Sequence, residues 1–132
     1  MPGDSVLFKR GSVFHGIIEV SGKGTPQQRI IIDAYGQGSK PCIIAPDSCL
    51  YTVLVKNSDY LTLQNLEIVN KGSNRLAGRT GVKVLCEDFG VSRNLILNAL
   101  YIHDVNGTLA KHSGEGSGIL IANSWKEHIS YY

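Results

Sequence analysis

The sequence predicts an all-β protein that folds as a right-handed parallel β-helix. One observation is that short segments with alternating apolar and polar residues recur along the chain, while no window keeps a helical period. The other is an internal repeat: residues 60–70 align with residues 94–104, and their matched apolar residues are 34 positions apart. A solenoid, in which equivalent strands stack coil upon coil, produces this kind of repeat.

The predicted strands are rich in Val, Ile and Leu, and clusters of Gly, Asn, Asp, Ser and Pro separate them. In chain order they are residues 5–9, 16–20, 29–35, 51–56, 60–63, 66–69, 81–86, 94–97, 100–103 and 118–122. The short breaks at 64–65 and 98–99 are expected to be corners between two strands. Asn57 and Asn123 are expected at turns, because asparagine tolerates the left-handed conformation.

The alternation also predicts which side chains face the interior, because every second residue of a strand lies on the same face. We expect one buried parallel stack of apolar rows. Its members are Val53, Val55, Leu61, Leu63, Leu66, Ile68, Val82, Val84, Leu95, Leu97, Leu100, Ile102, Ile119 and Ile121. An antiparallel lectin-like sandwich is the alternative fold, and it is disfavoured because no Asn-Gly or Asp-Gly pair links two alternating strands directly.

Composition narrows the classes of function. The formal net charge is +2 and the basic residues are scattered, so the dense basic face of a nucleic-acid-binding protein is not expected. No apolar run is long enough for a membrane span, and no signal peptide is visible at the start. Cys42, Cys49 and Cys86 are expected to be free thiols, although a Cys42–Cys49 bridge is an alternative.

Three segments resemble the pectin-lyase-like superfamily of right-handed parallel β-helices. They are Pro2–Gly11, Arg29–Gly36 with Lys40–Ile44, and the repeat at 51–70. The resemblance implies an exported protein, extracellular or periplasmic, whose β-helix has more coils than 132 residues can form. Residues 1–132 are therefore interpreted as a single β-helix segment, incomplete at one or both ends, whose partners are the remaining coils of a larger β-helix domain.

The best candidate site consists of two polar loops, residues 71–80 and 105–117, which follow equivalent strands. Because parallel stacking brings these loops to the same side, we expect Arg75, Arg79, Lys111 and His112 to form a cationic surface for acidic sugars. The alternative is a pair of ordinary solvated loops.

A second candidate is His103 with Asp104, beside Glu115. These residues could form an acid–base pair or an oxygen-lined calcium corner. The alternative is a surface histidine followed by a turn aspartate, with Asn70 as the equivalent of Asp104 one coil earlier. No cofactor motif is evident, no metal site is predicted in this chain, and calcium is left as an option for a longer protein.

These observations favour a segment of a carbohydrate-active β-helix, a polysaccharide lyase or glycosidase that acts on an acidic polysaccharide or oligosaccharide. The competing hypothesis is a non-catalytic binding or structural β-helix, such as an adhesin or scaffold. The fold by itself does not decide between them.

Overall fold

A computed structural model describes residues 1–109 and 116–124, and its regular elements are β-strands throughout. In chain order they are β1 (Ser5–Lys9), β2 (Val13–His15), β3 (Ile18–Val20), β4 (Ile30–Tyr35), β5 (Cys42–Ile44), β6 (Val53–Lys56), β7 (Leu61–Gln64), β8 (Glu67–Asn70), β9 (Thr80–Glu87), β10 (Leu95–Asn98), β11 (Tyr101–Val105) and β12 (Ser117–Ser124). No helix long and apolar enough to cross a membrane occurs among these residues.

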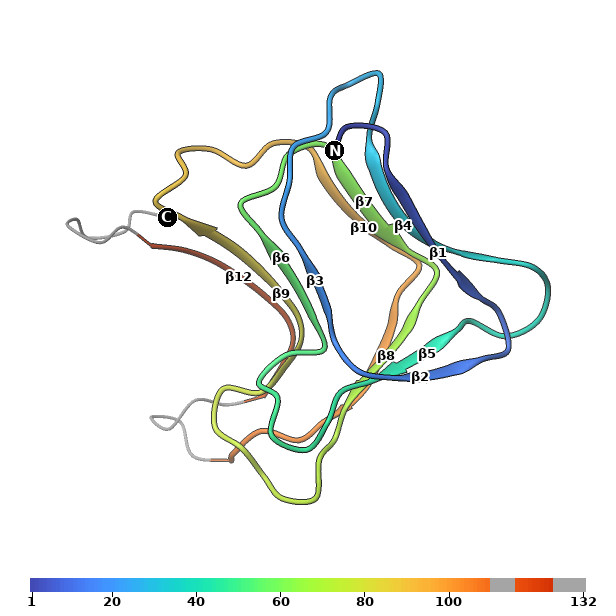
Figure 1. The fold of residues 1–132 in the computed structure, drawn as a ribbon. Helices are drawn as coiled ribbons and strands as arrows, with labels where there is room; N and C mark the ends of the chain where they lie inside the picture. Colours follow the sequence, from blue (N-terminus) through green and yellow to red (C-terminus); the bar gives the residue numbers. More distant parts are fainter. Residues whose placement is uncertain (110–115, 125–132) are drawn as a thin grey trace.

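Three parallel sheets enclose the interior. Sheet A has the order β1-β4-β7-β10, sheet B has β2-β5-β8-β11, and sheet C has β3-β6-β9-β12. Each coil contributes one strand to each sheet, and the chain turns clockwise as it recedes in Figure 1, which gives a right-handed solenoid. The predicted parallel β-helix is confirmed, and the antiparallel sandwich is wrong for the described strands.

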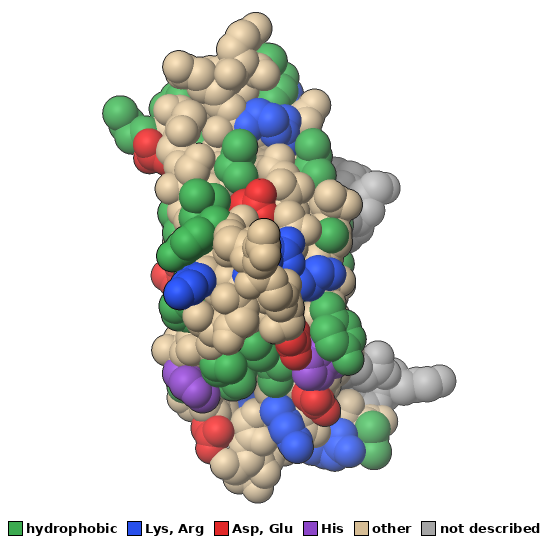
Figure 2. All heavy atoms as spheres, turned by 90° about the vertical axis from the view of Figure 1, so that its right-hand side faces the viewer, with side chains coloured by type: hydrophobic (Ala, Val, Ile, Leu, Met, Phe, Trp, Pro, Cys, Tyr) green, Lys and Arg blue, Asp and Glu red, His purple; other side chains and the backbone are tan. Residues whose placement is uncertain are grey.

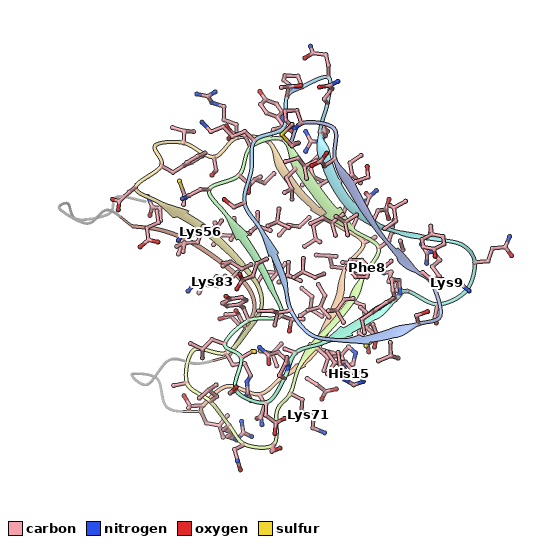
Figure 3. The ribbon with its side chains drawn as sticks, viewed as in Figure 1. Phe8, Lys9, His15, Lys56, Lys71 and Lys83 are labelled. Atoms are coloured by element: carbon pink, nitrogen blue, oxygen red, sulfur yellow. The ribbon has the colours of Figure 1, made fainter. Side chains whose placement is uncertain are left out.

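The strand register agrees with the 34-residue repeat. Leu61 pairs with Leu95 and Leu63 with Leu97 in sheet A, and Ile68 pairs with Ile102 in sheet B. The rows of sheet C follow the variable offsets seen in the sequence, because Val82 lies between Val53 and Ile119. Figure 3 shows the same alternation in side-chain direction: Phe8 points into the enclosed space, whereas Lys56 and Lys83 point away from it.

The predicted core is confirmed in the central coils and wrong at the last one. Its first eight members, from Val53 to Val84 in the order given above, are all buried. Leu95, Leu97, Leu100 and Ile102 are only partly buried against this cluster. Ile119 is 44% exposed and Ile121 is 71% exposed. These two side chains have the predicted direction, but described residues cover their rows from one side only.

Two corners between sheets A and B use left-handed backbone. Asn65 has φ 61° and Ala99, the equivalent residue one coil later, has φ 51°. Asn57 also has a positive φ, at 50°, as the sequence predicts. Asn123 differs from the prediction, because it lies within β12. Alanine has no side-chain hydrogen bond to offset the clash between its Cβ and the backbone in this conformation, so Ala99 is a strained position.

We expect Ala99→Asn to raise the free energy of unfolding by about 0.5–1 kcal/mol, because asparagine adopts the left-handed conformation at lower cost. Urea unfolding of the two proteins measures the change. Ala34→Asn is the matched control, because Ala34 lies within strand β4 with no positive φ and should gain nothing. Equal stability of Ala99→Asn and the wild type would contradict the strain at this corner.

Candidate functional site

Parallel pairing of β8 with β11 brings the two polar loops together, as predicted. The first loop, residues 71–79, and the start of the second loop, residues 106–109, lie at the same end of sheet B (Figure 1). The Leu76 N–H donates to Asn106 O at 3.1 Å, and Arg75 Nη1 donates to Gly107 O at 3.0 Å. The loops are therefore joined as well as stacked.

Arg75 remains exposed at the centre of this surface. On one side it lines a shallow depression of about 280 Å³ with Lys71, Asp104, Val105 and Asn106, which we call the Arg75 hollow. Arg75 also lines a second depression, of about 300 Å³, together with Asp47 and Ser73. Lys71, the first residue of the first loop, is labelled in Figure 3. Cationic and carboxylate side chains therefore line the same depressions.

Arg79 also borders the second depression, but it is not a free cation of this surface, and that expectation is wrong. Its side chain is 1% exposed. Nη1 donates to Lys71 O at 2.7 Å, to Asn74 O at 2.8 Å and to Asn106 O at 3.2 Å, and Nη2 donates to Asp47 O. The guanidinium thus donates its hydrogen bonds to backbone carbonyl groups of three loops. Arg79 therefore stabilises the loops and has no exposed charge for a ligand.

Two residues that sequence reasoning missed make this arrangement possible. Gly72 has φ +62°, and a Cβ at this position would lie 2.7 Å from Arg79 Cζ, so only glycine fits beside the guanidinium. Asn70 is fully buried, and its Nδ2 donates to Thr80 O at 2.9 Å and to Cys49 O at 3.2 Å. Asn70 thereby ties the two ends of the first loop together.

His103 lies between two carboxylates on the outer face of sheet B. Its Nε2 lies 2.6 Å from Glu67 Oε2, and its Nδ1 lies 2.8 Å from Asp104 Oδ2. The imidazole also stacks on the Tyr101 ring, with 4.4 Å between the centroids and 26° between the planes. His103 and Asp104 are therefore in contact, their predicted acid–base role stays a prediction, and Glu67 is a partner that the sequence analysis missed.

The predicted equivalence of Asp104 and Asn70 is wrong. His103 pairs with Val69 as expected, but Val105 pairs with Asn70, so Asp104 is an extra residue in the strand. Its φ of 53° is typical of such a bulge. The bulge turns the Asp104 carboxylate toward His103 and places it at the edge of the Arg75 hollow.

The two carboxylates favour the protonated imidazole. Hydrogen bonds to Glu67 and then Asp104 raise the pKa of His103 above its usual value, although burial opposes them. A raised pKa in the folded state means that this contribution to stability is complete below the unfolded pKa of about 6.5. The contribution is lost as the pH rises through the higher folded pKa.

We therefore expect His103→Gln to lower the free energy of unfolding most at acidic pH, with the difference from the wild type shrinking toward alkaline pH. Urea unfolding at several pH values measures this difference. Asp33 adds a separate dependence of stability on acidic pH. Burial acts to raise the pKa of Asp33, but hydrogen bonds from Asn65, Ala34 and Gln64 lower it below its usual value. Both proteins share that contribution, so the difference cancels it.

His15→Gln is the control, because His15 lies in the same outward row and has no ion pair with a described residue. A difference between His103→Gln and the wild type that grows with pH would contradict the imidazolium bridge.

Lys111, His112 and Glu115 lie outside the described residues, so their predicted roles stay predictions. Within residues 1–109 and 116–124, no group of three or more His, Cys, Asp and Glu side chains is arranged to hold a metal ion. Glu67 and Asp104 contact opposite edges of one imidazole and do not converge on a common point. Cys42, Cys49 and Cys86 are free thiols.

No family model matches the sequence. A search of curated proteins matches the lacto-N-biosidase of Bifidobacterium longum subsp. longum, with 27% identity across 98% of this chain. Among solved structures, the GH136 lacto-N-biosidase of Eubacterium ramulus superposes with a TM-score of 0.77 and 31% identity over 93% of this chain. The chain spans 11% of the first relative and 25% of the second.

An alginate lyase from Paenibacillus sp. str. FPU-7 superposes with a TM-score of 0.54 and 18% identity, over 92% of this chain and 52% of the lyase chain. At this level of identity the likeness concerns the fold alone. The two solved structures superpose on the coils of this chain, and their names describe different reactions.

Proposed function

We propose that this chain is a segment of a glycoside hydrolase that acts on oligosaccharides of the kind that lacto-N-biosidases cleave. The observation that supports this most strongly is the 31% identity over 93% of the chain with the Eubacterium ramulus lacto-N-biosidase. The alginate lyase shares only the coil architecture, at 18% identity. A hydrolase is therefore favoured over a polysaccharide lyase.

The substrate proposed here is a neutral oligosaccharide, not an acidic polysaccharide. The acidic substrate was expected from four cationic side chains, but Arg79 is buried against carbonyls, and Lys111 and His112 lie outside the described residues. Arg75 shares the depressions that it lines with Asp104 and with Asp47. Mixed donors and acceptors suit sugar hydroxyls, which both donate and accept hydrogen bonds.

In this proposal the Arg75 hollow contributes substrate contacts. Arg75 and Lys71 donate hydrogen bonds to hydroxyl oxygens, and the Asp104 carboxylate accepts from hydroxyl groups. Glycoside hydrolysis needs two carboxyl groups that flank the scissile bond. In this proposal, residues outside this chain supply these two carboxyl groups, because the chain spans 25% of the solved lacto-N-biosidase. An extracellular or periplasmic location and a calcium ion in a longer protein are further parts of the proposal.

The test is to incubate the intact protein with lacto-N-biosides and, separately, with alginate. A hydrolase adds water across the glycosidic bond and releases saturated sugars with new reducing ends, which chromatography and mass spectrometry identify. Unsaturated products from alginate would contradict hydrolysis and favour a lyase. No product from either substrate would favour the non-catalytic scaffold.

Arg75→Ala tests the hollow within this proposal. We expect KM for a neutral oligosaccharide to rise about tenfold, the equivalent of one good charge-assisted hydrogen bond. Arg10→Ala is the matched control, because Arg10 also donates to one backbone carbonyl, that of Gly38, at a distant turn. An equal KM in the wild type and both variants would contradict the claim that the Arg75 hollow contacts the substrate.

A further inference from the structure

We infer that the outer face of sheet B carries a second saccharide-binding site, formed by Tyr101, His103 and Glu67, which we call the Tyr101 platform. The inference rests on the proposed function, because it adds a contact surface for the same neutral oligosaccharide. The platform borders the Arg75 hollow at Asp104, which bonds to His103 and also lines the hollow. A chain of sugar residues can therefore contact both.

Tyr101 is an aromatic side chain that the fold leaves in water. It lies in an outward row of sheet B, next to Glu67, and is 55% exposed. Phe14 lies in the inward row of the same sheet and is half-buried, with its ring against Phe8 at 5.1 Å. A large ring exposed on a strand away from the core keeps apolar area available for a ligand.

The ring is also held in place before a ligand arrives. Tyr101 stacks on His103, and both edges of that imidazole are fixed by hydrogen bonds to carboxylate oxygens, those of Glu67 on the neighbouring coil and Asp104 on its own strand. Binding to a surface that is already ordered costs less conformational entropy than binding to a mobile one. The two carboxylates and the histidine thus act as positioning residues for the aromatic ring.

The chemistry around the ring selects a neutral sugar. The C–H face of a pyranose is apolar and packs on an aromatic ring, while its hydroxyl groups need acceptors. A carboxylate accepts up to about four hydrogen bonds. Glu67 and Asp104 therefore have capacity beyond the bonds to His103. A uronate in the same position would bring a third carboxylate close to these two, and like charges repel.

The surface around the platform fits an extended ligand. The row next to Tyr101 runs through His15, Ile44, Val69 and His103 from coil to coil. Figure 2 looks at this side of the molecule and shows hydrophobic side chains between two histidines, with acidic side chains beside one of them. Apolar area bordered by a few polar groups is typical of saccharide and other small-molecule sites.

The test measures the affinity of the intact protein for a non-hydrolysable neutral oligosaccharide by calorimetry, together with Tyr101→Thr and Tyr101→Phe. Threonine keeps the strand preference but removes the ring, and we expect it to weaken binding about tenfold. Phenylalanine keeps the ring and should bind within about twofold of the wild type. Tyr35→Thr is the matched control, because Tyr35 is an exposed strand tyrosine, 50% exposed, in sheet A. Circular dichroism and thermal unfolding establish that each variant folds.

Weaker neutral-sugar binding by Tyr101→Thr alone supports the platform, whether or not the intact protein hydrolyses lacto-N-biosides. Equal affinity of Tyr101→Thr and the wild type overturns the platform even where hydrolysis is observed. The platform is also overturned if the wild type binds a uronate oligosaccharide more tightly than a neutral one and Tyr101→Thr loses that preference. The site would then select acidic sugars, not neutral ones. If the intact protein does not hydrolyse lacto-N-biosides but binds the neutral oligosaccharide in a Tyr101-dependent way, the proposed function is overturned and the platform is supported.

Discussion

Replacing Arg79 with methionine is expected to lower the free energy of unfolding by about 3 kcal/mol or more. The guanidinium donates to carbonyls of Lys71, Asn74, Asn106 and Asp47 and is 1% exposed. Methionine fills much of the same volume but leaves these acceptors without their donor, at about 1–3 kcal/mol for each one that water does not reach. Urea unfolding measures the loss.

Arg75→Met is the control on the same loop. Because Arg75 is exposed, this substitution should lower the free energy of unfolding by less than about 1 kcal/mol. Gly72→Ala gives an independent check, since its Cβ would collide with the Arg79 guanidinium. Its cost should shrink in the Arg79→Met background, leaving only the backbone strain at φ +62°. Equal costs for Arg79→Met and Arg75→Met would contradict the buried clamp.

Leu63→Ala is expected to cost about 2–5 kcal/mol, the range for a fully buried leucine. Leu63 is 0% exposed and lies in the row between Ile32 and Leu97. Leu97 lies one coil later in that row but is only partly buried, so Leu97→Ala should cost less, about 1–2 kcal/mol. Both values come from urea unfolding of the variants.

Ile121→Ala completes the series, because Ile121 occupies an inward row but is 71% exposed and should cost less than about 0.5 kcal/mol. The order Leu63, Leu97, Ile121 follows from burial: Leu63 lies between two coils, Leu97 is partly buried, and Ile121 is the most exposed. A Leu97→Ala cost equal to that of Leu63→Ala would mean that the last coil is as well covered as the central ones.

The repeat was sufficient to predict the register of the coils. Leu61 with Leu95 and Ile68 with Ile102 pair as the 34-residue spacing indicates, because parallel stacking makes one coil the unit of the sequence pattern. Burial was less predictable, as Ile119 and Ile121 demonstrate. Alternation determines the direction of a side chain, whereas its burial depends on what lies on the neighbouring coil.

The candidate site was predicted in part. The meeting of the two loops and the His103–Asp104 contact follow from register, but the burial of Arg79 depends on how the first loop folds back over Gly72. Local sequence spacing contains no signal for that fold. The Glu67–His103 contact did have a signal in the sequence. These residues are one coil and two positions apart, which makes them diagonal neighbours on one face.

The measurement that tests the central claim most directly is chemical-shift mapping of the intact protein during titration with neutral and uronate oligosaccharides. Our account predicts that a neutral oligosaccharide shifts the backbone amides around Tyr101, His103, Lys71 and Arg75, and that the uronate oligosaccharide shifts them less. Shifts confined to the outer face of sheet C, where Lys56 and Lys83 point outward, would contradict it. So would a stronger response to the uronate oligosaccharide.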